Sequence, residues 1–166
     1  MIENIQAFTH YFESIRRRTL NYVCVIPADQ IDWALKPGEF TCGDIVRHLA
    51  GTELMYVGVV VSGVWKYPGH DRTLAPSLEE GIAYLERCHQ EAMYQLNGLL
   101  DGVLHESRPA LAKDSPPIRA WRWLMAMVEH ETHHRSQLAT YLTVMGVEPP
   151  QIYGMGVEDV IALATG

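Results

Sequence analysis

The chain has 166 residues, 48% of them hydrophobic, which is enough for one domain with a substantial core over residues 1–166. Thirteen basic residues stand against twenty acidic ones, and the formal charge of −7 argues against a nucleic-acid partner, whose phosphates require a basic surface. The longest uncharged stretches, residues 54–65 and 136–147, are too short to span a bilayer, so no membrane partner is expected.

The N-terminus and the cysteines indicate a cytoplasmic protein. The first twenty residues are amphipathic and lack the basic-then-apolar order of a signal peptide. Cys24, Cys42 and Cys88 are odd in number and form no C-x-x-C pair, so reduced thiols are the simplest interpretation. Cys42 lies near the start of a predicted helix, whose dipole can lower a thiol pKa, but packing is the expected role of all three cysteines.

Four long helices are predicted, separated by connections rich in proline and glycine. The first covers residues 2–25, where apolar residues recur at helical spacing. The second begins at Thr41, which with Asp44 resembles a capping box. It continues through the β-branched run 57–63, which we interpret as helix because no partner strand is evident. Its inner line consists of Ile45, His48, Leu49, Thr52, Met55 and Tyr56.

The third helix is predicted from Ser77, the start of a second capping box, to about Leu100. The remaining tail predicts a short helix near residues 157–163. The four long helices together imply an all-α fold, a four-helix bundle.

The fourth helix is predicted to begin at Pro116-Pro117, because proline suits the first turn of a helix. It runs to Met145, and Gly146 is a natural residue to follow a helix end. Its inner line consists of Trp123, Met127, His130, His134, Leu138, Tyr141 and Met145.

Residues 130–134 read His-Glu-Thr-His-His. Residues four apart lie on one face of a helix, so His130 and His134 can reach one metal ion together. Hydrogen-bonded core histidines are the alternative, but two unsatisfied rings on a core face would each cost several kcal/mol. His48, on the inner line of the second helix, is the natural third ligand. Three nitrogen donors leave a coordination position open, which is the catalytic pattern for zinc.

The same five residues fit the H-E-x-x-H signature of zinc metalloproteases, in which Glu131 would be the general base. That class also needs a third ligand downstream and a sheet above the helix. No histidine follows His134, and no convincing sheet can be written, so a metalloprotease is the remote alternative. Glu131 is instead expected to be a helix-surface acid or the partner of a nearby base. His133, off the inner line, is expected at the flank of the site.

A resemblance to the DinB/YfiT-like family of bacterial metal-binding four-helix bundles is carried by two segments, CGDIVRHLAGTE and EHETHHRSQLATYLTVMG. The family pattern is one histidine on the second helix and H-x-x-x-H-R-G-Q-L on the last, before a glycine. Ser136 departs from the pattern, which usually has glycine there to let another backbone pack closely. The matching residues are His48, His130, His134, Arg135, Gln137, Leu138 and Gly146.

The resemblance implies an up-down-down-up order of the helices, a homodimer and a small-molecule substrate. Characterised relatives include thiol-dependent S-transferases and isomerases, in which a divalent metal activates a low-molecular-weight thiol. It therefore implies a metal-dependent transferase or hydrolase in stress or detoxification, with zinc or nickel at His48, His130 and His134 and a water or thiol in the open position. A non-catalytic, metal-stabilised stress-response binding protein is the alternative.

Two arginines and three aromatic residues lie near the predicted ligands. Arg47 and Arg135 adjoin ligand positions and could hold a substrate carboxylate, although salt bridges between helices or subunits are the more ordinary role. Tyr56, Trp123 and Tyr141 could line a pocket, although aromatic residues at helical spacing usually belong to the core.

Overall fold

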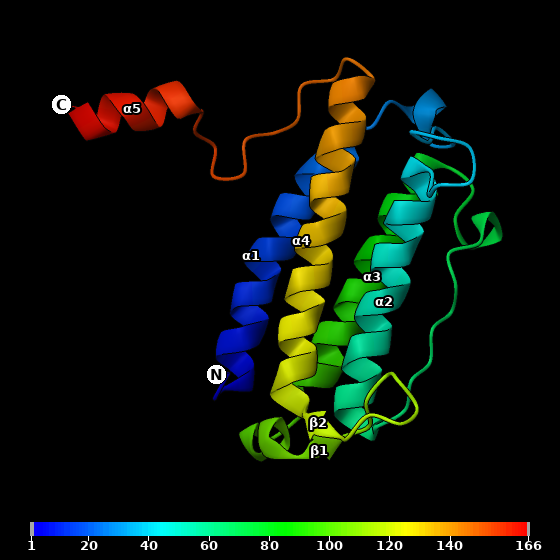
Figure 1. The fold of residues 1–166 in the computed structure, drawn as a ribbon, viewed down its shortest axis with the longest axis vertical. Helices are drawn as coiled ribbons and strands as arrows, with labels where there is room; N and C mark the ends of the chain where they lie inside the picture. The colour runs from blue at the N-terminus through cyan, green and yellow to red at the C-terminus, as the bar shows by residue number, and fades with distance from the viewer. Residues whose placement is uncertain (1, 166) are drawn as a thin grey trace.

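The computed structural model describes residues 2–165, in which four long helices pack side by side (Figure 1). Helices α1 and α4 run in one direction and α2 and α3 in the other, so the predicted bundle and its up-down-down-up order are confirmed. The helices are α1 (Ile5–Cys24), α2 (Cys42–Ser62), α3 (Leu78–Asn97), α4 (Ala120–Val144) and a short α5 (Val157–Thr165), with 3-10 turns at Ala28–Gln30, Arg72–Leu74 and Asp101–His105.

Both predicted capping boxes start their helices. The Thr41 hydroxyl accepts from the Asp44 amide at 3.0 Å, and the Asp44 carboxylate accepts from the Thr41 amide at 2.9 Å. Ser77 and Glu80 make the same reciprocal pair at 3.2 and 3.1 Å. Each pair satisfies amides that the first helical turn leaves without partners.

Helices α2 and α3 are parallel neighbours, so the chain must return along the bundle between them. Gly81, near the start of α3, packs against Val46, near the start of α2. Gly63 ends α2 with φ of 73°, a left-handed conformation that favours glycine. The return connection, residues 63–77, is called the strap below; it runs alongside α2 (Figure 1).

Two predicted helix ends are wrong because the intervening segment forms its own structure. Helix α4 starts at Ala120 rather than at the prolines, since strand β2 (Ile118–Arg119) pairs antiparallel with β1 (Ser107–Arg108). Helix α3 ends at Asn97 rather than near Leu100, which lies outside the helix and is 83% exposed.

A layer of charged residues divides the apolar core into two clusters. We call it the charged layer, and every one of the four long helices contributes to it. One apolar cluster contains Phe12 and Val57 on one side of this layer, and the other contains Ile45 and Leu138 on the opposite side. The charged layer consists of Arg16 (α1), Glu53 (α2), His89 (α3), Glu131 and Arg135 (α4). All of them are buried except His89, which is partly buried.

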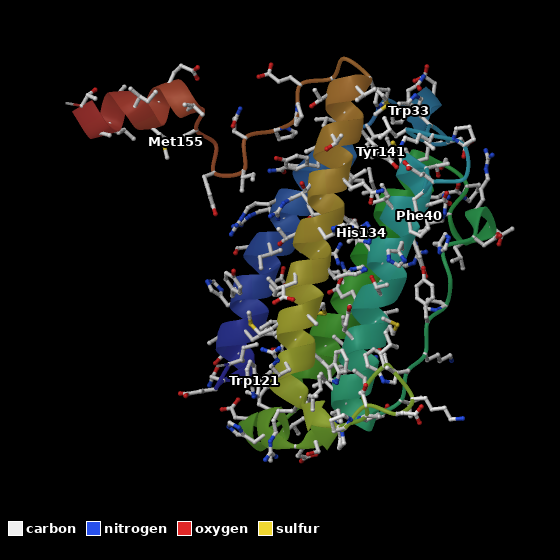
Figure 2. The ribbon with its side chains drawn as sticks, viewed as in Figure 1. Trp33, Phe40, Trp121, His134, Tyr141 and Met155 are labelled. Atoms are coloured by element: carbon white, nitrogen blue, oxygen red, sulfur yellow. The ribbon has the colours of Figure 1, made fainter. Side chains whose placement is uncertain are left out.

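Helix α5 extends away from the bundle with every residue exposed, and Met155 marks the segment that leads to it (Figure 2). By length and composition, α2 could cross a membrane, and it is the one helix within residues 2–165 of which this is true. In the bundle, 61% of its apolar window is buried, as in the core helix of a bundle.

Candidate metal centre

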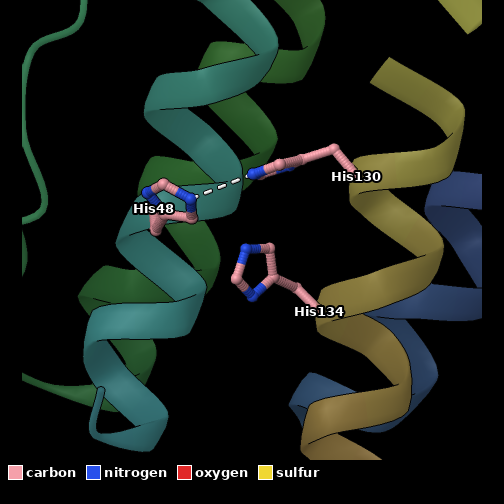
Figure 3. Close-up of side chains that lie close together, drawn as sticks. All are labelled: His48, His130 and His134. Atoms are coloured by element: carbon pink, nitrogen blue, oxygen red, sulfur yellow. Dashed lines mark hydrogen bonds between the residues drawn. The ribbon is translucent and has the colours of Figure 1, made fainter. Parts of the chain in front are cut away.

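Three histidines from two helices converge between α2 and α4 (Figure 3). His48, His130 and His134, called the histidine triad, each offer one ring nitrogen, and these nitrogens all lie within 4.8 Å of one another. The Nε2 atoms of His48 and His130 are 3.0 Å apart. The structure therefore brings together the three residues that the sequence singled out.

Helical periodicity explains the meeting of the triad. His130 and His134 are one turn apart on α4, so their rings lie edge to face along one side of the helix, 4.6 Å between centroids. His48 projects from the facing side of α2, with its ring 4.9 and 4.8 Å from those two. His134 is buried, whereas His48 and His130 are only partly buried, so the triad is not fully enclosed by the protein.

The ring nitrogen of His134 that faces away from the triad has a fixed partner. Its Nδ1 lies 2.9 Å from Oε1 of Gln137, an oxygen that can only accept, so Nδ1 carries the proton and Nε2 presents a lone pair. Gln137 donates to the Tyr141 hydroxyl at 3.2 Å, and Tyr141 donates to the Phe40 carbonyl at 2.9 Å. Figure 2 shows His134, Tyr141 and Phe40 in this part of the bundle. Such partners orient metal-binding imidazoles.

The Nδ1 atoms of His48 and His130 also have hydrogen-bond partners outside the triad. Nδ1 of His48 lies 2.7 Å from the Tyr67 hydroxyl. Nδ1 of His130 lies 3.5 Å from the Thr52 hydroxyl, which itself donates to the His48 carbonyl at 2.7 Å and so faces His130 as an acceptor. All three Nε2 atoms are thereby the ones left for a ligand.

Burial and mutual repulsion keep the triad neutral. Burial, followed by the neighbouring imidazoles His134 and His70, lowers the pKa of His48 from 6.5 to about 4. Burial, with His134 and His48, lowers the pKa of His130 to about 3. Burial also lowers the pKa of His134. Neutral imidazoles are the form that binds a metal.

The donor set fits a divalent cation. Zn–N bonds of about 2.0–2.1 Å in a tetrahedral site place two nitrogens about 3.3 Å apart. The 3.0 Å between His48 and His130 is close to that value, and the third nitrogen lies within 4.8 Å of both. Three neutral nitrogens with an open side suit zinc, nickel and related ions.

Glu131 is not at the triad, and this removes the metalloprotease alternative. Its side chain is buried, 2% exposed, and its Oε2 lies 3.2 Å from Nη2 of Arg16 on α1. The expectation of a surface acid is therefore wrong, while that of a partner to a nearby base is confirmed. A general base must reach the water that it activates, and this carboxylate faces the core instead.

Neither arginine beside the triad presents its charge to the open side. Arg47 is buried and donates to the carbonyls of His70 and Ala75 and to Asp44, at 2.8, 2.9 and 2.8 Å. Arg135 belongs to the charged layer, and its buried Nη1 has no hydrogen-bond partner within residues 2–165. Arg47 is therefore committed to the fold and is not placed to hold a substrate carboxylate, while Arg135 is buried in the core.

Of the other residues that the sequence singled out, some lie beside the triad and others belong to the core. The Tyr56 ring lies 5.7 Å from that of His130 and so lines the side of the triad, whereas Trp123 packs behind Tyr56, with 6.3 Å between their rings. Tyr141 is buried and acts through its hydrogen bonds. Burial raises the pKa of Cys42 to about 11, which excludes the thiolate that its helix position suggested. His133 is exposed at the flank, as predicted.

Several residues at the centre carried no signal in the sequence. Tyr67 and His70 come from the strap, whose path no periodicity predicts. Phe40 precedes α2, and its ring lies 5.2 Å from His48 and 6.3 Å from His134. Arg16 stands in a run of three arginines that resembles a charged surface.

Comparison with known proteins gives one consistent result. The model of the DinB family matches residues 1–162. A DinB-like protein from Bacillus cereus superposes with a TM-score of 0.73 at 19% identity, covering 91% of this chain and 99% of that one. A DinB-like protein from Bacillus subtilis gives 0.70 at 17% identity, covering 88% and 96%.

A further solved structure is YfiT from Bacillus subtilis, described as a probable metal-dependent hydrolase with an unusual four-helix bundle topology. It gives a TM-score of 0.69 at 18% identity and covers 89% of this chain and 91% of that one. None of the curated proteins matches the chain. At these identities the structural likeness concerns the fold.

Proposed function

The chain belongs to the DinB family, and on that premise we propose that it is a divalent-metal-dependent enzyme whose centre is the histidine triad. The observation that carries the proposal is the convergence of three neutral Nε2 atoms with one side left open. A purely structural zinc site is closed by four protein ligands, whereas a catalytic one keeps a position for substrate or water. Zinc or nickel is the proposed ion.

A low-molecular-weight thiol is the proposed nucleophile, and S-transfer to an electrophilic small molecule the proposed reaction. A bound divalent cation lowers the pKa of a thiol or of water enough to make either a nucleophile at neutral pH. A thiol, with an ordinary pKa of about 8.5, needs little further help. Water gains from a nearby carboxylate base, but the acid next to His130, Glu131, is committed to Arg16. The lack of a free carboxylate base therefore favours a thiol over water as the nucleophile.

The chain's own residues then hold and shield the reactants. Gln137, Tyr67 and Thr52 keep the imidazoles oriented through their Nδ1 atoms. Phe40 and Tyr56 flank the triad with apolar ring surface, which excludes water from part of its open side. Lower solvent access strengthens every charge interaction within the site.

Hydrolysis is the second candidate, because the similarly folded YfiT is described as a probable metal-dependent hydrolase. We also propose a homodimer in the cytoplasm with a role in stress or detoxification. All three cysteines are free, which supports a reducing compartment. The net charge of −7 supports a small-molecule substrate rather than a nucleic acid.

The test begins with protein purified without a nickel column and analysed for metals. Metal is then removed and restored while turnover is followed with several low-molecular-weight thiols and an electrophile, and with esters and amides in parallel. We expect one metal ion per chain, an intact fold after its removal, and thiol-dependent turnover that returns with metal. Ester or amide cleavage without thiol would establish the hydrolase instead. A bundle that melts on metal removal, with no turnover in any assay, would establish the non-catalytic binding protein.

A further inference from the structure

The strap is seated directly on helix α2, one turn beyond His48. A Cβ atom at Gly51 would lie 3.0 Å from Cγ of Pro68 and 3.1 Å from both Cε2 of Tyr67 and the carbonyl oxygen of Gly69. These distances are tighter than ordinary contacts, so glycine allows the strap to lie this close to the helix. The close approach places Tyr67 beside the triad.

Arg47 fastens the same segment from its other side. Its Nε donates to the His70 carbonyl at 2.8 Å and its Nη1 to the Ala75 carbonyl at 2.9 Å. The guanidinium is 2% exposed, and Gly43 leaves the room it needs, since a Cβ there would lie 2.8 Å from Nη1. Charge-assisted bonds to backbone carbonyls stabilise the strap in this position.

The Tyr67 hydroxyl lies between two imidazoles. It is 2.7 Å from Nδ1 of His48 and 2.9 Å from Nδ1 of His70. The hydroxyl has one proton, so it can donate to one ring and must accept from the other. The direction of this short chain of hydrogen bonds therefore depends on which nitrogen of His48 carries a proton.

We propose that Tyr67 is a positioning residue of the metal centre, and that metal binding at the triad is coupled to the closed position of the strap. The proposal rests on the proposed function. A metal on Nε2 of His48 requires the proton on Nδ1, which then donates to Tyr67, and Tyr67 donates to His70. Metal binding thereby selects one hydrogen-bonded arrangement that joins α2 to the strap.

Coupling between two events is reciprocal. If the closed strap favours metal, then metal favours the closed strap by the same factor. The strap is also the part of the site that is most exposed to solvent, with Tyr67 38% exposed. It is therefore the element whose backbone protection can report on metal binding without any measurement of turnover.

The experiment compares Tyr67→Phe with Tyr94→Phe, a matched control whose ring on α3 is 79% exposed. Zinc affinity is measured by competition with a chelating dye, and amide hydrogen exchange of residues 63–77 is measured with and without zinc. We expect zinc affinity to fall about 10- to 100-fold in Tyr67→Phe, the usual loss on removing an outer hydrogen-bond partner, and to stay unchanged in Tyr94→Phe. Zinc should slow exchange in the strap of the parent protein and of Tyr94→Phe, but not of Tyr67→Phe.

A second variant, Gly51→Ala, keeps the hydroxyl and displaces the strap. Alanine is a good helix former, so α2 should be retained while zinc affinity falls. Equal zinc affinity in the parent, Tyr67→Phe and Gly51→Ala would overturn the positioning role while leaving the metal centre intact. Zinc that binds without protecting the strap would overturn the coupling. A parent protein that binds no zinc or other divalent ion would overturn both this inference and the proposed function.

Discussion

Nε2 of His48 on α2 and Nε2 of His130 on α4 face each other at 3.0 Å. Two nitrogen lone pairs at this distance repel unless a proton or a cation lies between them. A proton on Nε2 of His48, or a cation shared by both nitrogens, removes this repulsion. In the first case Tyr67 donates to Nδ1 of His48, and in the second it accepts from that atom.

The first prediction concerns metal content. His134→Ala should lose stoichiometric metal, because two imidazoles remain where three are needed for tight binding. His133→Ala is the control, since its ring is the next one along α4 but is exposed at the flank. Elemental analysis of both proteins decides the matter, and equal metal in the two would refute the assignment of His134.

The second prediction concerns the charged layer. Arg16→Met should lower the free energy of unfolding by about 3–5 kcal/mol, since it leaves Glu53 and Glu131 buried without their cation. Arg17→Met, one residue along and exposed, should change it by less than about 0.5 kcal/mol. Urea denaturation measures both. Similar losses in the two variants would show that the layer does not depend on Arg16.

The third prediction separates Glu131 from catalysis. Glu131→Gln should reduce stability, because its carboxylate pairs with Arg16 at 3.2 Å, yet metal content and turnover per folded molecule should stay at the parent level. Turnover is compared after correction for the folded fraction measured by circular dichroism. A loss of several hundred-fold in turnover with metal retained would restore the general base of a metalloprotease.

The fourth prediction concerns pH. The folded-state pKa values of His48 and His130, about 4 and about 3, lie below the ordinary 6.5, so the unfolded chain binds more protons between these values. The metal-free protein should therefore lose stability as pH falls from about 6.5 toward 4. Urea midpoints at several pH values measure the slope. His130→Asn should flatten it, and an unchanged slope in this variant would contradict the pKa assignment.

The pKa of His89 is shifted in the opposite direction to those of His48 and His130, so its effect on the pH dependence of stability is also opposite. Burial opposes its charge, but the hydrogen bond and charge of Glu53, helped by Glu13, outweigh burial and raise its pKa above 6.5. Its contribution to stability is complete below pH 6.5 and is lost as pH rises through the raised value. A variant of His89 should therefore approach the stability of the parent protein at alkaline pH.

Periodicity and capping made much of the fold predictable. The i, i+4 spacing of His130 and His134 and the inner line of α2 were enough to choose the triad. The start of α4 was missed because two short strands, which pair across residues 109–117, have too few residues to leave a pattern. A pair of two-residue strands is defined by the hydrogen bonds between them, so neither strand can be identified from its own sequence. The end of α3 was missed because a short 3-10 turn, Asp101–His105, follows it.

The outer parts of the site could not be predicted for a similar reason. Arg16 and Glu53 are 37 residues apart, and only packing brings them together. Glu131 looked like a surface acid because charged residues are rarely buried. The sequence marks the ligands themselves, since metal chemistry restricts their type and spacing, but it does not mark the path of the strap that carries Tyr67 and His70.

The parallel course of α2 and α3 has a consequence for divergence within the family. Their link must travel the whole length of the bundle, and its middle passes the triad. Surface links tolerate insertions and substitutions better than helices do, so the residues of this link that lie beside His48 can vary while α2 and α4 still carry the three imidazoles. One scaffold can in this way acquire new substrates by altering a single loop.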